Sequence, residues 1–300
     1  MRNPAVMFSL IVIIGSLAVM ITRGVKDRGK VLGVDFTGGT SLTFEFDKKV
    51  PIEMIRATLS DAGINDPGIQ YQREMESTKE FLSIKTGVDS IKGRMPSDIV
   101  KESIAKDYFD AGFKVLLEDE VGPQIGSDLK MKALIAFGVS LVGMIIYLWC
   151  RFEFGFSMGA IVALMHDVLF TMGIYSLCGR QLNMSALAAL LTIVGYSVND
   201  TIVIFDRIRE NLRLVRDKNF RQICNLSMNQ TLSRTILTSG ATLITVVMLL
   251  IFGGGAIYDF ALTLFIGMIV GSYSTLFIAT PVVLFWHQDK RPDFATKKKI

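Results

Sequence analysis

Long apolar runs alternate with polar segments along the chain, and six of the runs are long enough to be considered for crossing a bilayer. A spanning helix needs roughly 20 mostly apolar residues. The runs stay apolar instead of alternating residue by residue, which favours helical spans over the strands of a β-barrel. The predicted spans cover residues 5–22, 131–150, 156–178, 185–205, 235–253 and 260–286. We therefore expect an α-helical polytopic membrane protein with six transmembrane helices.

The first apolar run has a second interpretation, a cleaved signal peptide. It is short and follows a single basic residue, Arg2, as the start of a secretory signal does. However, its end, SLAVMITRG, offers no clear A-x-A cleavage site. A retained anchor is the favoured interpretation, with residues 1–30 forming the first transmembrane helix and its exit.

Between the first two runs lies one large polar insert, residues 31–128, with the pattern of a small water-soluble domain. Alternation of apolar and polar residues predicts four strands, and segments that open with Pro and close with Gly predict two helices. In chain order these are a strand at 41–46, a helix at 51–63, strands GIQYQRE and EFLSIKT, a helix at 96–112 and a strand FKVLLEDEV. The order βαββαβ is that of a ferredoxin-like α+β domain.

The insert shows no pattern of catalytic residues. It contains no histidine, no GxSxG sequence and no metal-ligand spacing. The glycine pair in VDFTGGT (34–40) leads into a predicted strand and not into a helix, so we interpret it as a tight backbone turn and not as a phosphate loop. We expect a binding or mechanical role without enzyme activity, cofactor or metal.

Basic residues indicate the orientation of the chain in the membrane. They gather in the loop after the fourth run and in a basic tail at 289–300, whereas the loops on the other side are poor in Lys and Arg. Because Lys and Arg accumulate on the cytoplasmic side, we expect both termini in the cytoplasm and the insert outside, in the periplasm. The cluster directly after the first run, from Arg23 to Lys30, opposes this orientation. The five later runs then form a helical bundle over 129–288.

Part of the basic loop has an amphipathic pattern. Residues 206–219, DRIRENLRLVRDKN, place Ile208, Leu212 and Val215 on one face, with cations around the rest. This pattern predicts a helix lying in the inner membrane interface, within a cytoplasmic amphipathic segment over 206–230.

Composition agrees with a membrane protein. Half of the 300 residues are hydrophobic, and the mean hydropathy is +0.43. The net charge of +4 reflects the basic loops, so no nucleic-acid binding is expected. The three cysteines form no CxxC pair and predict no disulfide framework.

Polar residues inside the apolar runs carry the candidate chemistry. In the fourth run, helical spacing puts Thr192, Tyr196, Asn199 and Asp200 on one side. A charge at the middle of a membrane helix costs about 2.5–3.5 kcal/mol on the insertion scale, so such residues usually face other helices or water. An intramembrane carboxylate such as Asp200 is therefore interpreted as functional.

The fifth run carries a matching polar stripe, and Arg234 lies at a depth close to that of Asp200. An Arg neighbour favours an ionised carboxyl and desolvation favours the neutral form, so a pair of Asp200 and Arg234 is suited to reversible proton uptake. A static ion pair, or an Arg that reaches to the membrane surface, is the alternative. The stripe consists of Thr231, Arg234, Thr238, Thr242 and Thr245.

The third run has His166 and Asp167 near its middle. His166 is able to shuttle protons, and a simple hydrogen bond between helices explains it equally well. Glycines in the runs permit close helix packing, namely Gly138, Gly143, Gly159, Gly173, Gly267 and Gly271. The candidate ion-coupling residues are Asp200, Arg234 and Asn199, with His166, Asp167, Tyr196 and Thr238 as supporting polar residues.

Several blocks of the sequence together resemble the SecF family of bacterial export proteins. They are GVDFTGGT (33–40), EDEVGPQIGSDL (118–129), MHDV (165–168), VGYSVNDTIVIFDRIREN (194–211) and SRTILTS (233–239). The resemblance covers nearly the whole chain, and its fourth block is highly specific. It implies half of an assembly of the RND superfamily, with six spans and one outer insert, in the bacterial inner membrane.

The resemblance also implies partners and an energy source. SecD is the pseudo-symmetric other half, and the pair uses the proton-motive force, or sodium in some bacteria, to help pull preproteins out of the SecYEG channel. SecA, YajC and YidC are further candidate partners. The Asp of VND and the Arg of SRT, which are Asp200 and Arg234, are tied to ion coupling, and a second essential Asp belongs to SecD. Whether the chain is a free subunit or half of a fused polypeptide stays open.

Three other functions are alternatives to this one. A small-molecule efflux half-transporter of the RND type needs large paired outer domains, whereas this chain has one insert of modest size. An intramembrane aspartyl protease using Asp167 and Asp200 needs two facing carboxylates that share a proton. No GxGD-like sequence occurs, and the neighbouring Arg234 and Asn199 fit ion coupling better. A passive scaffold for other Sec subunits is the third.

Overall fold

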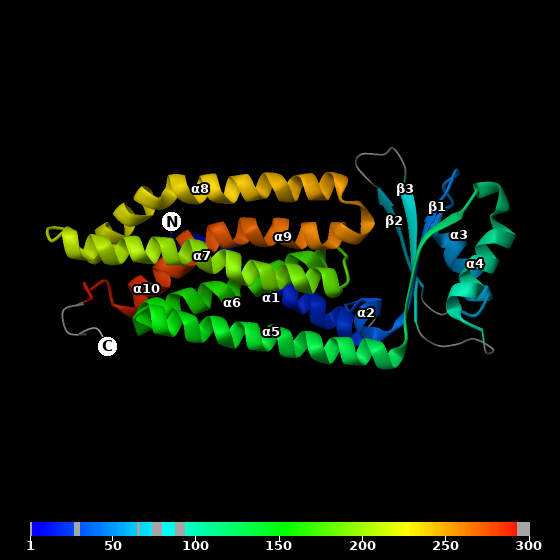
Figure 1. The fold of residues 1–300 in the computed structure, drawn as a ribbon, viewed down its shortest axis with the longest axis horizontal. Helices are drawn as coiled ribbons and strands as arrows, with labels where there is room; N and C mark the ends of the chain where they lie inside the picture. Colours follow the sequence, from blue (N-terminus) through cyan, green and yellow to red (C-terminus); the bar gives the residue numbers. More distant parts are fainter. Residues whose placement is uncertain (1, 27–30, 65–66, 74–79, 88–93, 293–300) are drawn as a thin grey trace.

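The computed structural model describes residues 2–26, 31–64, 67–73, 80–87 and 94–292. The chain forms an elongated molecule with a bundle of long helices at one end and a small α/β domain at the other (Figure 1). The basic tail predicted at 289–300 lies outside the described residues from residue 293 onward.

Six long helices and one short one form the described part of the bundle, at the positions of the predicted apolar runs. They are α1 (Arg2–Lys26), α5 (Pro123–Arg151), α6 (Phe154–Leu177), α7 (Met184–Leu214), α8 (Phe220–Phe252), α9 (Gly254–Ser274) and α10 (Thr280–Trp286). A π-helical segment, η3 (Thr275–Ala279), joins α9 to α10, so the last two helices follow one path. Most helices are longer than the predicted runs because they continue into polar residues at their ends.

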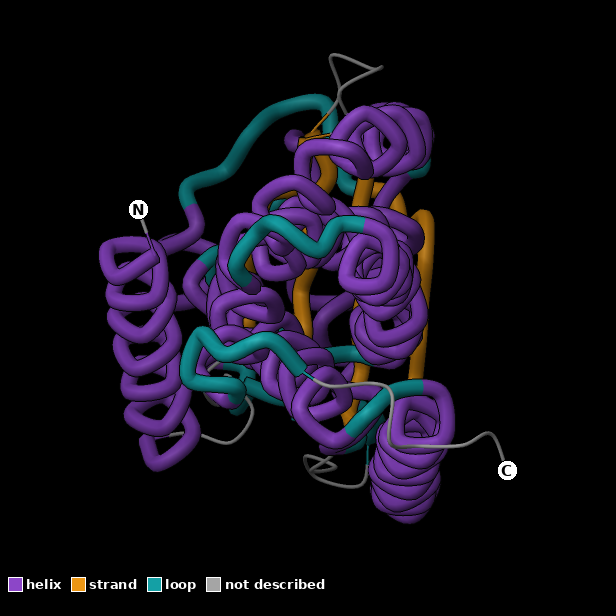
Figure 2. Tube along the Cα trace, turned by 90° about the vertical axis from the view of Figure 1, so that its left-hand side faces the viewer, coloured by secondary structure: helices purple, strands orange, loops and turns teal. Residues whose placement is uncertain are grey.

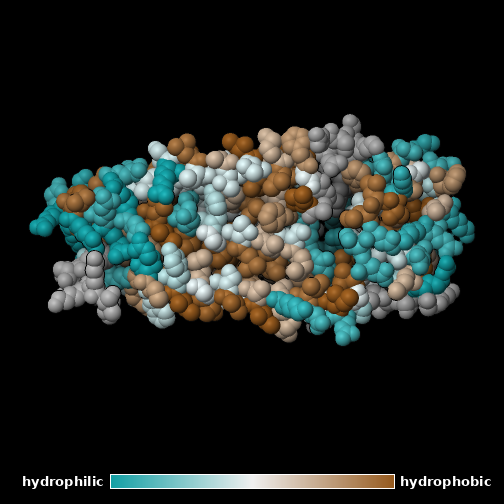
Figure 3. Space-filling model, in the orientation of Figure 1, coloured by the Kyte–Doolittle hydropathy of each residue, from teal (hydrophilic) through white to brown (hydrophobic). Residues whose placement is uncertain are grey.

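Five spans meet the length and hydropathy of a membrane helix within the described part of the chain. They are α5, α6, α7, α8 and the path from Ile257 to Trp286, while the apolar part of α1, Val6–Thr22, is shorter. The helix α1 packs beside α6, where a side chain at Gly173 would overlap Ser16. The surface over the helices is mostly apolar and both ends are mostly hydrophilic (Figure 3). These features are those of a multi-pass membrane protein.

The insert forms the predicted ferredoxin-like arrangement. The elements are α2 (Val34–Thr37), β1 (Gly39–Glu45), α3 (Ile52–Asp61), β2 (Gly68–Arg73), β3 (Glu80–Thr86), α4 (Pro96–Asp107), a 3₁₀ turn η2 (Phe109–Ala111) and β4 (Lys114–Val121). The sheet has the order β2-β3-β1-β4 with antiparallel neighbours, and α3 and α4 cover one face (Figure 1). The prediction of this domain is confirmed, as is the glycine turn, since Gly38 and Gly39 have φ of 75° and 137°.

Alternating residues of the strands build the core of the domain. Leu42 and Phe44 of β1 and Leu82 and Ile84 of β3 are at most 2% exposed and pack with the apolar faces of α3 and α4. The opposite face of the sheet is turned toward the bundle, and the strands stand behind the helices when the molecule is viewed along its length (Figures 1 and 2).

The amphipathic segment after the fourth run differs from its prediction. Residues 206–214 continue α7 and residue 220 begins α8, so no separate helix over 206–219 lies in the interface. Ile208 and Leu212 are buried in the core shared with α8 and α10. The buried Asn211 donates to Ser227 and Gln230 of α8, at 2.8 Å each. An amphipathic pattern fits packing against neighbouring helices as well as a membrane surface, and here the apolar face packs against α8 and α10.

Glycine contacts divide the predicted packing positions into two groups. A methyl group at Gly267 would overlap the side chain of Ile193 on α7, and one at Gly159 would lie 2.6 Å from a Val283 methyl. By contrast, a methyl group added at Gly138 or Gly143 of α5 would have nothing within 4 Å, so these two glycines have no packing role within the described chain.

The substitution Gly267→Ala tests the close contact of α9 with α7. We expect it to lower the free energy of unfolding by about 1–3 kcal/mol, because the added methyl group overfills a packed site. The midpoint of thermal unfolding of the purified protein in detergent measures this change. The matched control Gly143→Ala should leave the midpoint unchanged or raise it, and equal midpoints for the two variants would contradict the packing assigned to Gly267.

Candidate functional site

Asp200 lies on α7, is 5% exposed and is bonded to a neighbouring helix. Its Oδ2 accepts a hydrogen bond from Ser239 Oγ of α8 at 3.1 Å. Ser239 in turn accepts from Ser272 Oγ of α9 at 3.2 Å. This short chain of hydroxyl groups connects the carboxyl group to two other helices.

Asp167 on α6 is a second carboxyl group, and it is completely buried. Its Oδ1 is 2.9 Å from His166 Nδ1, and its Oδ2 accepts from Ser274 Oγ of α9 at 2.8 Å. Ser197 Oγ of α7 donates to the same Oδ2. Asp167 therefore holds three helices together, which is the helix-to-helix role left open in the sequence. His166 Nε2 is buried and has no hydrogen-bond partner among the described residues.

An irregular helical segment begins directly after Ser274. The π-helical η3 covers Thr275–Ala279, and Thr275 Oγ1 lies 3.3 Å from Thr201 Oγ1 of α7. Pro281 follows at the start of α10 and has no N–H to donate to the carbonyl four residues earlier. A π-helical turn is one way for a helix to accommodate such a break, and such turns are frequent at functional sites. The backbone is thus irregular beside the Asp167 cluster.

The predicted direct pair of Asp200 with Arg234 is not formed in this structure. Arg234 is exposed on α8, and within the described residues no carboxylate lies within ion-pair distance of it. Ser239, five residues further along α8, takes the position next to Asp200. The guanidinium group still lies close enough for its charge to act on Asp200.

The polar stripe predicted on α7 is divided between the inside and the surface of the bundle. Asp200 is buried and Tyr196 is half-buried, whereas Thr192 and Asn199 are exposed. Successive residues of a helix point about 100° apart, so Asn199 and Asp200 cannot face the same neighbour. The Tyr196 hydroxyl is buried without a hydrogen-bond partner among the residues that the structure describes.

The threonines of the predicted stripe on α8 bond their hydroxyl groups to the backbone of the preceding turn. Thr238 Oγ1 donates to the Arg234 carbonyl at 2.8 Å, and Thr242 Oγ1 donates to the Thr238 carbonyl at 3.0 Å. Such bonds to the preceding turn lower the cost of placing a hydroxyl group in lipid. Arg234 and Asn199 remain as exposed polar side chains for which the described part of the chain provides no side-chain hydrogen bond.

Comparison with known proteins agrees with the resemblance. The family model described as "Protein export membrane protein SecD/SecF, C-terminal" matches residues 100–289, and the "SecD/SecF GG Motif" model matches residues 31–50. The chain belongs to the SecD/SecF family. A protein translocase subunit SecF from Desulfurispirillum indicum is 40% identical, with 95% of this chain and 90% of that protein covered. A SecF from Koribacter versatilis is 44% identical, with 74% of this chain and 56% of that protein covered.

A solved structure of a SecD/SecF relative has the same fold. The crystal structure of SecDF, a translocon-associated membrane protein from Thermus thermophilus, is 34% identical with a TM-score of 0.81. The alignment covers 96% of this chain and 38% of the SecDF chain, so this chain spans less than half of that protein. The family match supports an accessory subunit of Sec translocation and does not favour the efflux or protease alternatives.

Four serines that contact the carboxyl groups or each other were not identified from the sequence. They are Ser197, Ser239, Ser272 and Ser274. A serine in a membrane helix commonly bonds to its own backbone, so its presence does not identify a partner. The spacing of Ser272 and Ser274, which serve different carboxyl groups from one helix, becomes meaningful only when the register of the helices is known.

The substitution Asp167→Ala tests the buried cluster. It removes the partner of His166 Nδ1 and of the Ser197 and Ser274 hydroxyl groups, of which Ser274 keeps a bond to the Gly271 carbonyl, and each buried group left unpaired costs about 1–3 kcal/mol. We expect the free energy of unfolding to fall by about 3 kcal/mol or more, measured by thermal or denaturant unfolding in detergent.

The control for this prediction is Asp206→Ala. Asp206 forms an ion pair with Arg151 at 2.5 Å in which both side chains are 40% exposed. Exposed ion pairs contribute about 0–1 kcal/mol, so this variant should unfold nearly as the wild type does. A loss for Asp167→Ala no larger than for Asp206→Ala would show that the cluster does not hold the helices together.

Proposed function

We propose that this chain acts with SecD as the ion-coupled unit that assists the export of preproteins through the SecYEG channel. One observation carries the proposal: within a family of protein-export membrane proteins, Asp200 is a buried carboxyl group bonded to a different helix through Ser239. Intramembrane carboxyl groups mark ion pathways by default. The protein then lies in the bacterial inner membrane with both termini in the cytoplasm and the insert in the periplasm.

Protonation of Asp200 changes the contacts between α7 and α8. The ionised carboxylate accepts a hydrogen bond from Ser239 and is attracted by the charge of Arg234. When a proton binds, the attraction to Arg234 is lost and the carboxyl group gains a donor of its own. Release of the proton to the cytoplasm restores the first state. Each cycle thus alternates two packings of α8 against α7, with no enzymatic step.

The exposed polar groups of α7 and α8 indicate where SecD binds. Asn199 and Arg234 lie on helices that cross the membrane, and burying such groups in lipid is costly. A partner helix with polar groups at the same depth satisfies both. The neighbouring Ile236 and Leu237 are 61% and 73% exposed, so this part of α8 also presents apolar side chains to lipid or to a partner. SecA, YajC and YidC are proposed as further partners without an assigned surface.

Asp200→Asn tests the coupling role. Asn keeps a carbonyl that accepts from Ser239 but takes up no proton, so we expect the gradient-dependent part of preprotein export to disappear while assembly with SecD is kept. The measurement is export into membrane vesicles with and without a proton gradient, repeated with a sodium gradient to identify the ion. Asp206→Asn, on the same helix and half-exposed, is the control and should export normally. Normal gradient-driven export by Asp200→Asn would refute the role of this carboxyl group.

Arg234→Leu tests the electrostatic partner separately. We expect it to remove the gradient-dependent export as well, because Asp200 then lacks the charge that distinguishes its two protonation states. Arg213→Leu is the matched control, since Arg213 is exposed near the end of α7. Export by Arg234→Leu at the wild-type rate in the same vesicle assay would remove Arg234 from the mechanism.

A further inference from the structure

The segment that enters the outer domain is bonded to the loop that precedes α7. Gly33 N–H donates to the Leu182 carbonyl at 2.6 Å, and Leu182 N–H donates to the Val31 carbonyl at 2.8 Å. A methyl group at Gly33 would come within 3.1 Å of the Leu182 carbonyl oxygen, so the two backbones lie as close as glycine allows. The start of the outer domain and the start of α7 are therefore one connected piece of backbone.

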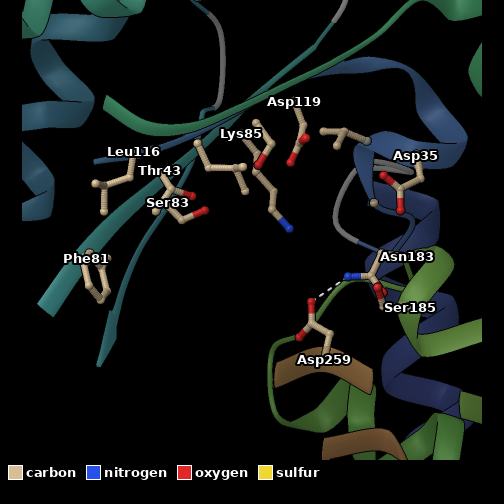
Figure 4. A pocket seen from close by; sticks show the side chains of 14 residues that line it. Asp35, Thr43, Phe81, Ser83, Lys85, Leu116, Asp119, Asn183, Ser185 and Asp259 are labelled. Carbon is tan, nitrogen blue, oxygen red and sulfur yellow. Dashed lines mark hydrogen bonds between the residues drawn. The ribbon is translucent and has the colours of Figure 1, made fainter. Parts of the chain in front are cut away.

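Asp35 of this segment caps α7. Its Oδ2 accepts from the backbone N–H of Met184, the first residue of the helix, at 2.8 Å. Asn183 supplies the ordinary cap by accepting from Ala186 N–H, and its side chain donates to Asp259 Oδ2 of α9 at 2.6 Å. A carboxylate at a helix N-terminus also interacts favourably with the helix dipole. Figure 4 shows Asp35, Asn183 and Asp259 together on the helix side of the cavity.

The other end of the segment contacts α5. The turn at Gly38 and Gly39 leads into β1, and a methyl group at Gly126 of α5 would lie 2.7 Å from the Gly38 backbone nitrogen. Two backbones thus meet without side chains between them. The glycine pair, interpreted from the sequence only as a turn, joins the sheet to the bundle.

Elsewhere the sheet and the helix ends are separated by a cavity of about 380 Å³. Lys85 of β3 points into it (Figure 4). Its Nζ donates to Gln181 Oε1 at 3.2 Å. Burial lowers the pKa of Lys85, the carboxylates of Asp259 and Asp35 act in the opposite direction, and Arg180 acts with burial. Across the cavity the sheet and the helix ends thus interact through one hydrogen bond and the charges around Lys85, whereas the direct backbone contacts lie in the segment 33–39.

We propose that residues 33–39 transmit the position of the outer sheet to α7, with Asp35 as a positioning residue for Asp200. The inference rests on the proposed function of Asp200. Asp200 lies 16 residues beyond Met184 on the same helix, a distance of about 24 Å at 1.5 Å per residue. A displacement of the sheet at this segment shifts the first turn of α7, and the continuous helix carries the shift to the carboxyl group. Conversely, a change at Asp200 reaches the sheet by the same path.

The test uses the complete complex with SecD in vesicles and compares paired variants. Asp35→Ala removes the acceptor of Met184 N–H, whereas Asp35→Asn keeps an acceptor there. We expect Asp35→Ala to reduce gradient-driven export about five- to ten-fold, with gradient-independent export unchanged, and Asp35→Asn to stay within about two-fold of wild type. Gly126→Ala should be defective in the same way, because it displaces Gly38. Gly122→Ala on the same helix end has nothing within 4 Å and should export normally.

Two further measurements separate transmission from simple support of the fold. The first is backbone hydrogen exchange of residues 184–187, which should be about five-fold faster in Asp35→Ala than in wild type. The second is the amount of each variant that copurifies with SecD, by which its export rate is divided. Faster exchange with unchanged gradient-driven export would show a purely structural cap and overturn the proposal. So would equal losses for Asp35→Ala and Asp35→Asn.

Asp200→Asn is measured in parallel. Normal gradient-driven export by Asp200→Asn would overturn the proposed function itself. A defective Asp200→Asn beside a normal Asp35→Ala would overturn only the transmission through Asp35.

Discussion

A carboxyl group closed off from water must be matched by hydrogen-bond donors, and this requirement determines how α6, α7, α8 and α9 are held together. Asp167 accepts hydrogen bonds from serines of α7 and α9. Asp200 accepts one from Ser239 of α8, which in turn accepts one from Ser272 of α9. Apolar packing alone would allow these helices to slide, because lipid is as apolar as the helix surfaces. The polar contacts give the bundle a defined register.

The two carboxyl groups differ in a way that suits different roles. Asp167 is completely buried and is contacted by three polar groups, so its environment favours one fixed arrangement. Within the described part of the chain, Asp200 has a single hydroxyl donor, Ser239, and a cation nearby, Arg234, that does not contact it directly. A group with few fixed partners loses little when its charge changes. This contrast supports Asp200 as the group that changes state and Asp167 as the group that keeps the surrounding helices in place.

Local patterns in the sequence were sufficient for much of the fold. The apolar runs predicted the bundle helices, and alternation with flanking Pro and Gly predicted the ferredoxin-like order, because these signals depend on neighbouring residues only. The burial of Asp200 followed from its place in an apolar run. The direct pair with Arg234 was predicted wrongly, because the partner of Asp200 depends on the rotation and register of α8 against α7, which no local pattern contains. The same lack of register information hid Ser239 and the serines of α9.

The other misses have the same origin at longer range. The face with Ile208 and Leu212 was assigned to the membrane surface, since its pattern does not reveal whether lipid or a neighbouring helix covers it. The glycine turn was recognised because positive φ is a local demand. The cap that Asp35 provides was not recognised from the sequence. A helix is normally capped by the residue just before it, and here Asn183 already occupies that position.

The helices α7 and α9 share both carboxyl clusters but have opposite mechanical character. The helix α7 is a regular α-helix from Met184 to Leu214, bonded at its first residue to Asp35 and near its other end to α8 through the buried Asn211. The path of α9 is interrupted by the π-helical η3 directly after Ser274. A regular helix transmits displacement along its axis, whereas a π-helical turn before a proline permits local rearrangement. In the proposed mechanism, a change of charge at Asp200 is therefore passed along the axis of α7, whereas the π-helical segment lets the path of α9 rearrange locally beside Asp167.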